Sequence, residues 1–174
     1  VTKFGVVAAR EAIQDSNLQL DELDKTRCGV IVSSGIGGLE TIEKEHTTGM
    51  TKGFHRISPF FIPMSITNIT AGSIAIETGL QGSCHCIVTA CASATDSIGM
   101  AFRRIRDGYQ EVMLAGGSEA SITELGIGGF SAMKALSFAD DITRASIPFD
   151  RERNGFVMGE GSGILVLEEY EHAK

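Results

Sequence analysis

The sequence predicts an α/β protein with a mixed, mainly parallel sheet. Short apolar runs rich in β-branched residues alternate with longer segments whose apolar residues recur at helical spacing. This alternation is typical of βαβ units, in which consecutive strands lie parallel. With 174 residues, of which 43% are hydrophobic and 21% charged, the chain is long enough to bury a core.

The first half of the chain predicts helix, strand and helix in turn. Residues 4–15 have a helical period, which Asn17 is expected to end. Cys28–Ser33 is expected to be a buried strand, followed by a glycine loop over 34–38 and a helix from residue 39 to 48. Residues 51–63 contain two prolines and are expected to be irregular, and a helix of small residues is expected over 65–79.

The second half predicts three more strands, so that the sheet has at least four. We expect strands over 82–90, 111–115 and 163–168, a helix over 91–106, and irregular loops over 125–130 and 148–156. On the helix, Ile98, Phe102 and Ile105 have the spacing of a core-facing side.

Composition and charge limit the classes of function. No apolar stretch approaches the roughly 20 residues of a membrane-spanning helix. The 15 basic and 22 acidic residues give a net charge of −7, which argues against nucleic acid as the main partner. The spacing of the four cysteines, at 28, 84, 86 and 91, matches neither a paired zinc site nor a small disulfide framework, so we expect reduced intracellular thiols. The start at Val1, without methionine or leader, suggests a piece of a longer protein.

Cys91 lies where a β-branched run passes into a helical pattern. The free N–H groups of a first helical turn carry about half a positive charge, which favours a thiolate over a thiol. The same N–H groups could hold the oxyanion that forms when a thioester carbonyl is attacked. Cys91 is therefore a candidate nucleophile, and the alternative is a small buried apolar residue, the common fate of a free cysteine.

The residues offer two other kinds of site, a metal site and a dinucleotide site. A metal site would use Cys84, Cys86, Cys91 and His85, but alternation along a strand sends 84 and 86 to the face opposite 85, and no second ligand pair follows. A dinucleotide site would use the glycine loops, but both lack the third glycine of that motif. We expect no metal and no cofactor.

Several motifs together resemble the decarboxylating β-ketoacyl synthases. They are Thr89-Ala-Cys-Ala-Ser93, Ala115-Gly-Gly-Ser-Glu119, Gly128-Gly-Phe130, Pro148-Phe-Asp150, Asp150-Arg-Glu-Arg-Asn-Gly-Phe156 and Gly159-Glu-Gly-Ser-Gly163. The flanks Ser33–Leu39, Ile57–Phe61 and Val166–Lys174 are most similar to the long-chain elongating type II enzymes of fatty-acid synthesis. Polyketide ketosynthases share the cysteine motif but match these flanks less well. Ala94, where the family more often has glycine, is a small departure.

The resemblance implies a thiolase-like fold with αβαβα layers, of which this chain would hold most of the N-terminal half. Residues 1–174 would then be an incomplete N-terminal β-ketoacyl synthase domain. The C-terminal half, which carries the two catalytic histidines and the catalytic lysine of the family, is expected to be absent. The histidines at 46, 55, 85 and 172 do not match those motifs. We therefore expect the isolated chain to be inactive in condensation.

The resemblance also implies an activity and a set of site residues. Cys91 would accept an acyl group from acyl-[acyl carrier protein], and the carbanion of decarboxylated malonyl-[acyl carrier protein] would attack the resulting thioester. Ile36, Phe61 and Phe130 match positions of the acyl pocket, although Phe61 and Phe130 could simply pack in the core. His55, Arg56 and Lys134 match basic positions where the carrier protein docks, although they could be an ordinary surface.

The same resemblance implies a homodimer in the cytoplasm of a bacterium, with an organelle of a eukaryote as an alternative. A polyketide ketosynthase and a noncatalytic chain-length partner remain alternative functions.

Overall fold

The computed structural model describes all residues from 1 to 174. At its centre is a four-stranded sheet with the strand order β2-β1-β3-β4. The strands are β1 (Cys28–Ser33), β2 (Cys84–His85), β3 (Val112–Glu119) and β4 (Gly161–Glu168). The first three are parallel, whereas β4 runs antiparallel to β3. The mixed, mainly parallel sheet of the prediction is therefore confirmed.

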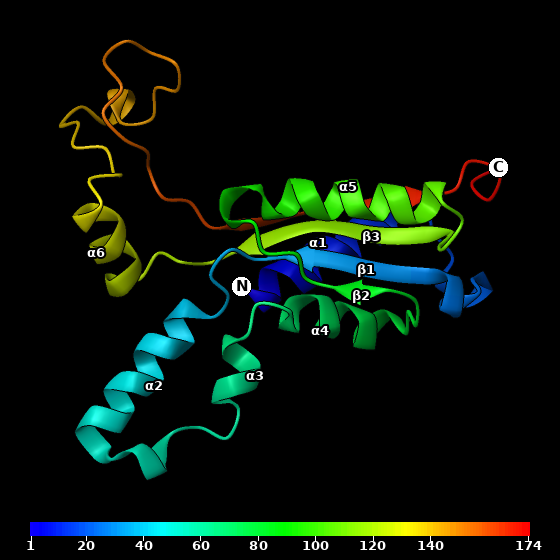
Figure 1. The fold of residues 1–174 in the computed structure, drawn as a ribbon, viewed down its shortest axis with the longest axis horizontal. Helices are drawn as coiled ribbons and strands as arrows, with labels where there is room; N and C mark the ends of the chain where they lie inside the picture. The colour runs from blue at the N-terminus through cyan, green and yellow to red at the C-terminus, as the bar shows by residue number, and fades with distance from the viewer.

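Helices cover both faces of this sheet (Figure 1). Helix α5 (Ser93–Arg106) packs on one face, and α1 (Thr2–Asp15) and α4 (Ile69–Thr78) pack on the other. Because successive side chains of a strand point to opposite faces, β1 supplies both cores: Val30 lies under α1 and α4, and Ile31 under α5. None of the helices combines the length and the apolar character that a membrane span needs.

Two segments project from the sheet beyond the carboxyl ends of β1 and β3 (Figure 1). The first arm, residues 39–65, holds α2 (Leu39–Lys52), a 3-10 turn (Phe54–Arg56) and α3 (Phe61–Ser65). The second arm, residues 124–156, holds α6 (Glu124–Ala132) and a 3-10 turn (Ile142–Arg144). Two further 3-10 turns, Leu20–Glu22 and Lys25–Arg27, precede β1.

Several predicted elements are confirmed. Asn17 takes a left-handed φ of 55° directly after α1, as expected for a residue that ends a helix. The strand Cys28–Ser33 and the irregular segment 148–156 are found as expected, and β4 includes the predicted strand 163–168. The predicted helix over 39–48 is α2, which extends to Lys52.

Other predicted elements were wrong in extent or type. The expected strand 82–90 is reduced to Cys84–His85, because β2 is an edge strand and the chain leaves the ladder after it. The expected helix 65–79 is shortened to α4, because the chain is extended at Ile66. The segment 51–63, expected to be irregular, contains most of α3. Conversely, β3 runs through the two glycines that were expected to follow it.

The glycine loop predicted over 125–130 is instead the helix α6. The Thr123 side chain accepts a hydrogen bond from the N–H of Gly126 and so caps this helix. A Cβ at Gly126 would collide with the carbonyl oxygen of Ser121, so a glycine is required there for close packing. The cap and this packing override the low helix propensity of glycine.

The core-facing side of α5 also differs from the prediction at one residue. Ile98 and Ile105 pack against the sheet as expected, but Phe102 is 56% exposed. Ala101 is fully buried instead, because the most buried line of α5 runs through Ser93, Ser97 and Ala101 at four-residue spacing.

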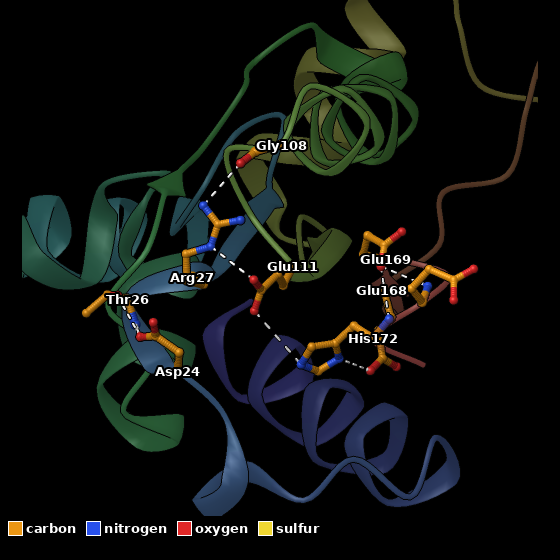
Figure 2. Close-up of polar contacts among 9 residues, drawn as sticks. Asp24, Thr26, Arg27, Gly108, Glu111, Glu168, Glu169 and His172 are labelled. Carbon is orange, nitrogen blue, oxygen red and sulfur yellow. Dashed lines mark hydrogen bonds and ion pairs between the residues drawn. The ribbon is translucent and has the colours of Figure 1, made fainter. Parts of the chain in front are cut away.

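A polar cluster lies at the end of the sheet opposite to the two arms, where β1 and β3 begin and β4 ends (Figure 2). Nδ1 of His172 lies 2.6 Å from a carboxylate oxygen of Glu168, and its Nε2 lies 4.0 Å from Glu111. Arg27 pairs with Glu111 at 3.2 Å and donates to the carbonyl oxygen of Gly108. His172 is therefore a structural residue at the edge opposite to Cys91.

Candidate active site

Three loops meet at the carboxyl edge of the parallel strands, where α/β proteins place their ligand sites. They are residues 34–38 after β1, residues 86–92 after β2, and residues 120–123 after β3. Cys91 lies in the second of these loops. Its place at this edge follows from the parallel pairing of the three strands.

Cys91 is exposed in the 3-10 turn Ala90–Ala92, which leads directly into α5. The residue before it, Ala90, has a φ of 52°, a left-handed conformation that is costly for any residue with a Cβ. The buried hydroxyl of Ser93 braces this conformation: it accepts a hydrogen bond from the N–H of Thr89 at 2.9 Å and donates to the carbonyl oxygen of Ala90 at 2.7 Å. The turn thus presents Cys91 outward, as expected for a nucleophile and unlike a core residue.

A second pair of hydroxyls attaches this segment to the sheet. The side-chain oxygens of Ser33 and Ser97 lie 2.5 Å apart, and both residues are buried. Ser33 also accepts a hydrogen bond from the N–H of Ile87 at 2.8 Å. The end of β1, the loop that carries Cys91 and helix α5 are therefore held together by one short network.

The other cysteines differ from Cys91 in their surroundings. Cys28 is fully buried, and this burial raises the pKa of its thiol. Cys84 is on the edge strand and Cys86 is half-buried in the loop after it. Only Cys91 combines exposure with a position immediately before a long helix.

The three predicted acyl-pocket residues lie on different segments. Ile36, 38% exposed, is in the loop after β1, and this loop passes close to the Cys91 turn: a Cβ at Gly35 would lie 3.5 Å from the carbonyl oxygen of Ala90. Phe61 is the first residue of α3, on the first arm, and is half-buried. Phe130 lies on α6, on the second arm, where its ring meets Phe156 edge-on at 5.4 Å. The structure therefore brings the loop that carries Ile36 close to the Cys91 turn and places the two aromatic residues on the arms.

The three predicted docking residues are exposed on the same two arms. His55 and Arg56 form the 3-10 turn after α2, and Lys134 follows α6 with a left-handed φ of 56°. Their role in docking stays a prediction.

A cavity of about 1180 Å³ lies between the first arm and the start of the chain, where α1 and α4 begin. Threonines and charged residues make up much of its lining, which includes none of Cys91, Ile36, Phe61 and Phe130. No group of three or more His, Cys, Asp or Glu side chains is placed to hold a metal ion.

Sequence reasoning missed the residues that hold the site together. Glu119, at the end of β3, accepts hydrogen bonds from the loop that carries Ile36, and Ser93 and Ser33 act on the Cys91 segment as described. Glu119 and Ser93 lie inside motifs that suggested the family. The partners of Ser93 are only three and four positions away, whereas Ser34 and Gly35, which donate to Glu119, are 85 and 84 positions away. A carboxylate at the end of a buried strand was the one signal that could have pointed to Glu119.

Solved ketosynthases share this architecture. The ketosynthase of a type II PKS, solved in complex with its acyl-carrier protein and bound to the hexaketide, superposes with a TM-score of 0.91 at 38% identity, covering 98% of this chain and 44% of that one. A beta-ketoacyl synthase from Burkholderia phymatum superposes with a TM-score of 0.87 at 32% identity, covering 99% and 43%. The sheet, its helices and the Cys91 turn therefore define a thiolase-like α/β protein of the ketosynthase type.

The chain belongs to the β-ketoacyl synthase family, since residues 1–173 match the family model of the beta-ketoacyl synthase N-terminal domain. It is 50% identical over 171 residues to 3-oxoacyl-[acyl-carrier-protein] synthase 2 of Synechocystis sp., covering 98% of this chain and 41% of that protein. It is 49% identical over 173 residues to the synthase of the same name from Staphylococcus aureus, covering 99% and 43%. The chain thus spans about two fifths of the length of these relatives.

Proposed function

We propose that this chain supplies the acyl-accepting cysteine of a β-ketoacyl-[acyl carrier protein] synthase of fatty-acid biosynthesis. The observation that carries the proposal is the exposed Cys91 on its braced turn, in a chain about half identical to 3-oxoacyl-[acyl-carrier-protein] synthases. Residues 1–174 would form the N-terminal β-ketoacyl synthase domain of an enzyme that also needs a C-terminal half.

In the first step, the Cys91 thiolate attacks the thioester carbonyl of acyl-[acyl carrier protein]. A new S–C bond forms, the tetrahedral oxyanion collapses, and the carrier thiolate leaves and takes up a proton. In the second step, malonyl-[acyl carrier protein] loses carbon dioxide, and its carbanion attacks the Cys91 thioester and releases the Cys91 thiolate. The residues described here serve the first step.

The proposal includes a carrier-protein partner, a homodimer and a cytoplasmic location. The carrier protein in complex with a related ketosynthase supports the first, and the bacterial source of the two related synthases supports the last. Exposed His55, Arg56 and Lys134 would face the acidic carrier protein, and Ile36, Phe61 and Phe130 would line the path of the acyl chain.

A polyketide ketosynthase is the second candidate, since a ketosynthase of that kind superposes with a TM-score of 0.91. The higher identity to the fatty-acid synthases, 50% against 38%, favours the first candidate. A noncatalytic partner subunit is disfavoured by the exposed Cys91.

The test is acyl transfer to the chain itself, measured by intact mass and peptide mapping after incubation with an acyl-[acyl carrier protein]. We expect one acyl group on Cys91, no acylation of Cys91→Ser, and unchanged acylation of Cys86→Ser, the matched control in the same loop. Acylation that persists in Cys91→Ser, or no acylation of the unsubstituted chain, would contradict the proposal.

A further inference from the structure

Glu119 collects three hydrogen bonds at the carboxyl edge of the sheet. One carboxylate oxygen accepts from the hydroxyls of Ser34 at 2.9 Å and Ser121 at 3.2 Å, and the other accepts from the N–H of Gly35 at 2.6 Å. Ser34 and Ser121 are buried, so these bonds are shielded from water. Hydrogen bonds of a carboxylate are among the stronger ones in proteins.

Two of these bonds attach the loop after β1, residues 34–38, to Glu119. The hydroxyl of Ser34, which donates to Glu119, also accepts from the N–H of Gly37 at 2.8 Å, so that the loop closes on itself around Ile36. The loop has room for no side chain at Gly35: a Cβ there would lie 2.9 Å from the Glu119 carboxylate and 3.5 Å from the carbonyl oxygen of Ala90. The backbone that carries Ile36 is therefore confined between Glu119 and the turn that carries Cys91.

The chemistry of the three donors requires a carboxylate. A carboxylate offers only acceptors, whereas an amide of the same shape would turn an NH₂ group toward at least one of the donors. The donors also come from two separate loops, since Ser121 precedes the second arm. Glu119 thus connects the loop after β1, which carries Ile36, to the loop after β3, which leads to the second arm and Phe130.

We propose that Glu119 is a positioning residue for the acyl group: it holds the 34–37 loop against the Cys91 turn, so that Ile36 borders the path of a long acyl chain to the sulfur. This inference rests on the proposed function. On this proposal a long chain passes Ile36, whereas a short acyl group and a small alkylating reagent need only Cys91. Loss of the carboxylate frees the loop, and each long chain must then order it at an entropic cost.

The experiment compares Glu119→Gln with Glu160→Gln. Glu160 is a suitable control because it is exposed and accepts a single hydrogen bond from the N–H of Ile122 at 2.8 Å, at the same edge. Acylation of Cys91 is measured with a four-carbon and a twelve-carbon acyl-pantetheine thioester, and its alkylation with iodoacetamide. For Glu119→Gln we expect the long-to-short ratio of acylation rates to fall about tenfold, and the iodoacetamide rate to stay within about twofold. Glu160→Gln is expected to change neither.

Two further readouts separate positioning from a general structural effect. Amide exchange of residues 35–37 is expected to rise about tenfold in Glu119→Gln and not in Glu160→Gln. Ile36→Ala is expected to change the ratio of long-chain to short-chain acylation rates when it is the only substitution. The same substitution should change this ratio much less in the Glu119→Gln background, because the effects of residues that act through one another are not additive.

The outcomes distinguish this inference from the proposed function. Normal acylation of the unsubstituted chain, with an unchanged long-to-short ratio in Glu119→Gln, would overturn the role of Glu119 alone. An equal slowing of iodoacetamide and both thioesters would overturn it too, since the effect would then lie on Cys91 itself. Failure of the unsubstituted chain with both thioesters would overturn the proposed function and this inference with it.

Discussion

At the scale of single residues, Cys91 differs from Cys28 in accessibility. It is exposed on a turn, whereas Cys28 is fully buried and has a pKa raised by that burial. The folded state therefore holds the Cys28 proton more tightly than the unfolded chain does, and Cys28 becomes reactive only above the pH range of an ordinary thiol.

We expect limited alkylation at a series of pH values, followed by peptide mapping, to label Cys91 fastest and Cys28 slowest at every pH. The lag of Cys28 should persist at alkaline pH and vanish in denaturant, where all four cysteines should label alike. Equal labelling of the four thiols without denaturant would contradict the described fold.

The buried hydroxyl pair Ser33–Ser97 gives a second prediction at this scale. Ser33→Ala removes the acceptor of the part-buried Ile87 N–H and the hydrogen-bond partner of the buried Ser97 hydroxyl, and we expect it to cost about 2–3 kcal/mol of unfolding free energy. Ser97→Ala removes one partner and should cost about 1 kcal/mol.

Denaturant unfolding measures both changes. The double variant should cost less than the sum of the two, because the residues share one hydrogen bond. Ser146→Ala, at an exposed serine, is the control and should have an effect within about 0.5 kcal/mol. Additive effects would indicate that the two hydroxyls do not interact.

At the scale of elements, the contact between α5 and β3 decides where Cys91 lies. A Cβ at Gly117 would lie 2.7 Å from the Cβ of Ala94, in the first turn of α5. The start of this helix therefore rests directly on the backbone of β3, and it can do so only because residue 117 has no side chain.

We expect Gly117→Ala to cost about 1–3 kcal/mol in unfolding free energy, since the added methyl group pushes α5 away from the sheet. Displacement of the first turn should also lower the alkylation rate of Cys91. Adding Ala94→Gly should restore part of both losses, because it removes the methyl group that the new one meets. If Ala94→Gly by itself destabilises the protein and restores nothing, the contact is not the cause.

The elements also show where sequence patterns mislead. The glycines at 126, 128 and 129 predicted a loop, but a threonine cap and a close contact with Ser121 make this segment the helix α6. On α5, helical spacing assigned Phe102 to the core, but the most buried line of this helix runs through Ser93, Ser97 and Ala101, and Phe102 is exposed. Local patterns report which residues share a face, whereas the packing between elements decides which of them are buried.

At the scale of the whole molecule, the two arms expose much apolar surface. Phe149 is 97% exposed, and Met133 and Phe60 are exposed on the same arms. Large apolar side chains exposed together on one segment are typical of surfaces that bind another protein or the chain itself.

We therefore expect the chain by itself to self-associate, with a mass that rises with concentration in sedimentation experiments. Phe149→Ser, at the most exposed of these residues, should weaken the association, whereas Tyr170→Ser, at an exposed residue outside the arms, should leave it unchanged. A monodisperse monomer that melts cooperatively at all concentrations would contradict this expectation.

The sequence by itself determined the fold class and the position of Cys91, the candidate nucleophile, directly before a helix. Alternating strand and helix patterns predicted the mainly parallel sheet, and the motif at residues 89–93 predicted Cys91 at the entrance to a helix, because both signals lie within short stretches of chain. Only the tertiary structure decided the strand order, which residues of α5 are buried, and the contacts of Glu119. Glu119 and its partner Ser34 are 85 positions apart, and no local period encodes a hydrogen bond between them. It forms because β1 and β3 lie side by side and end at the same edge.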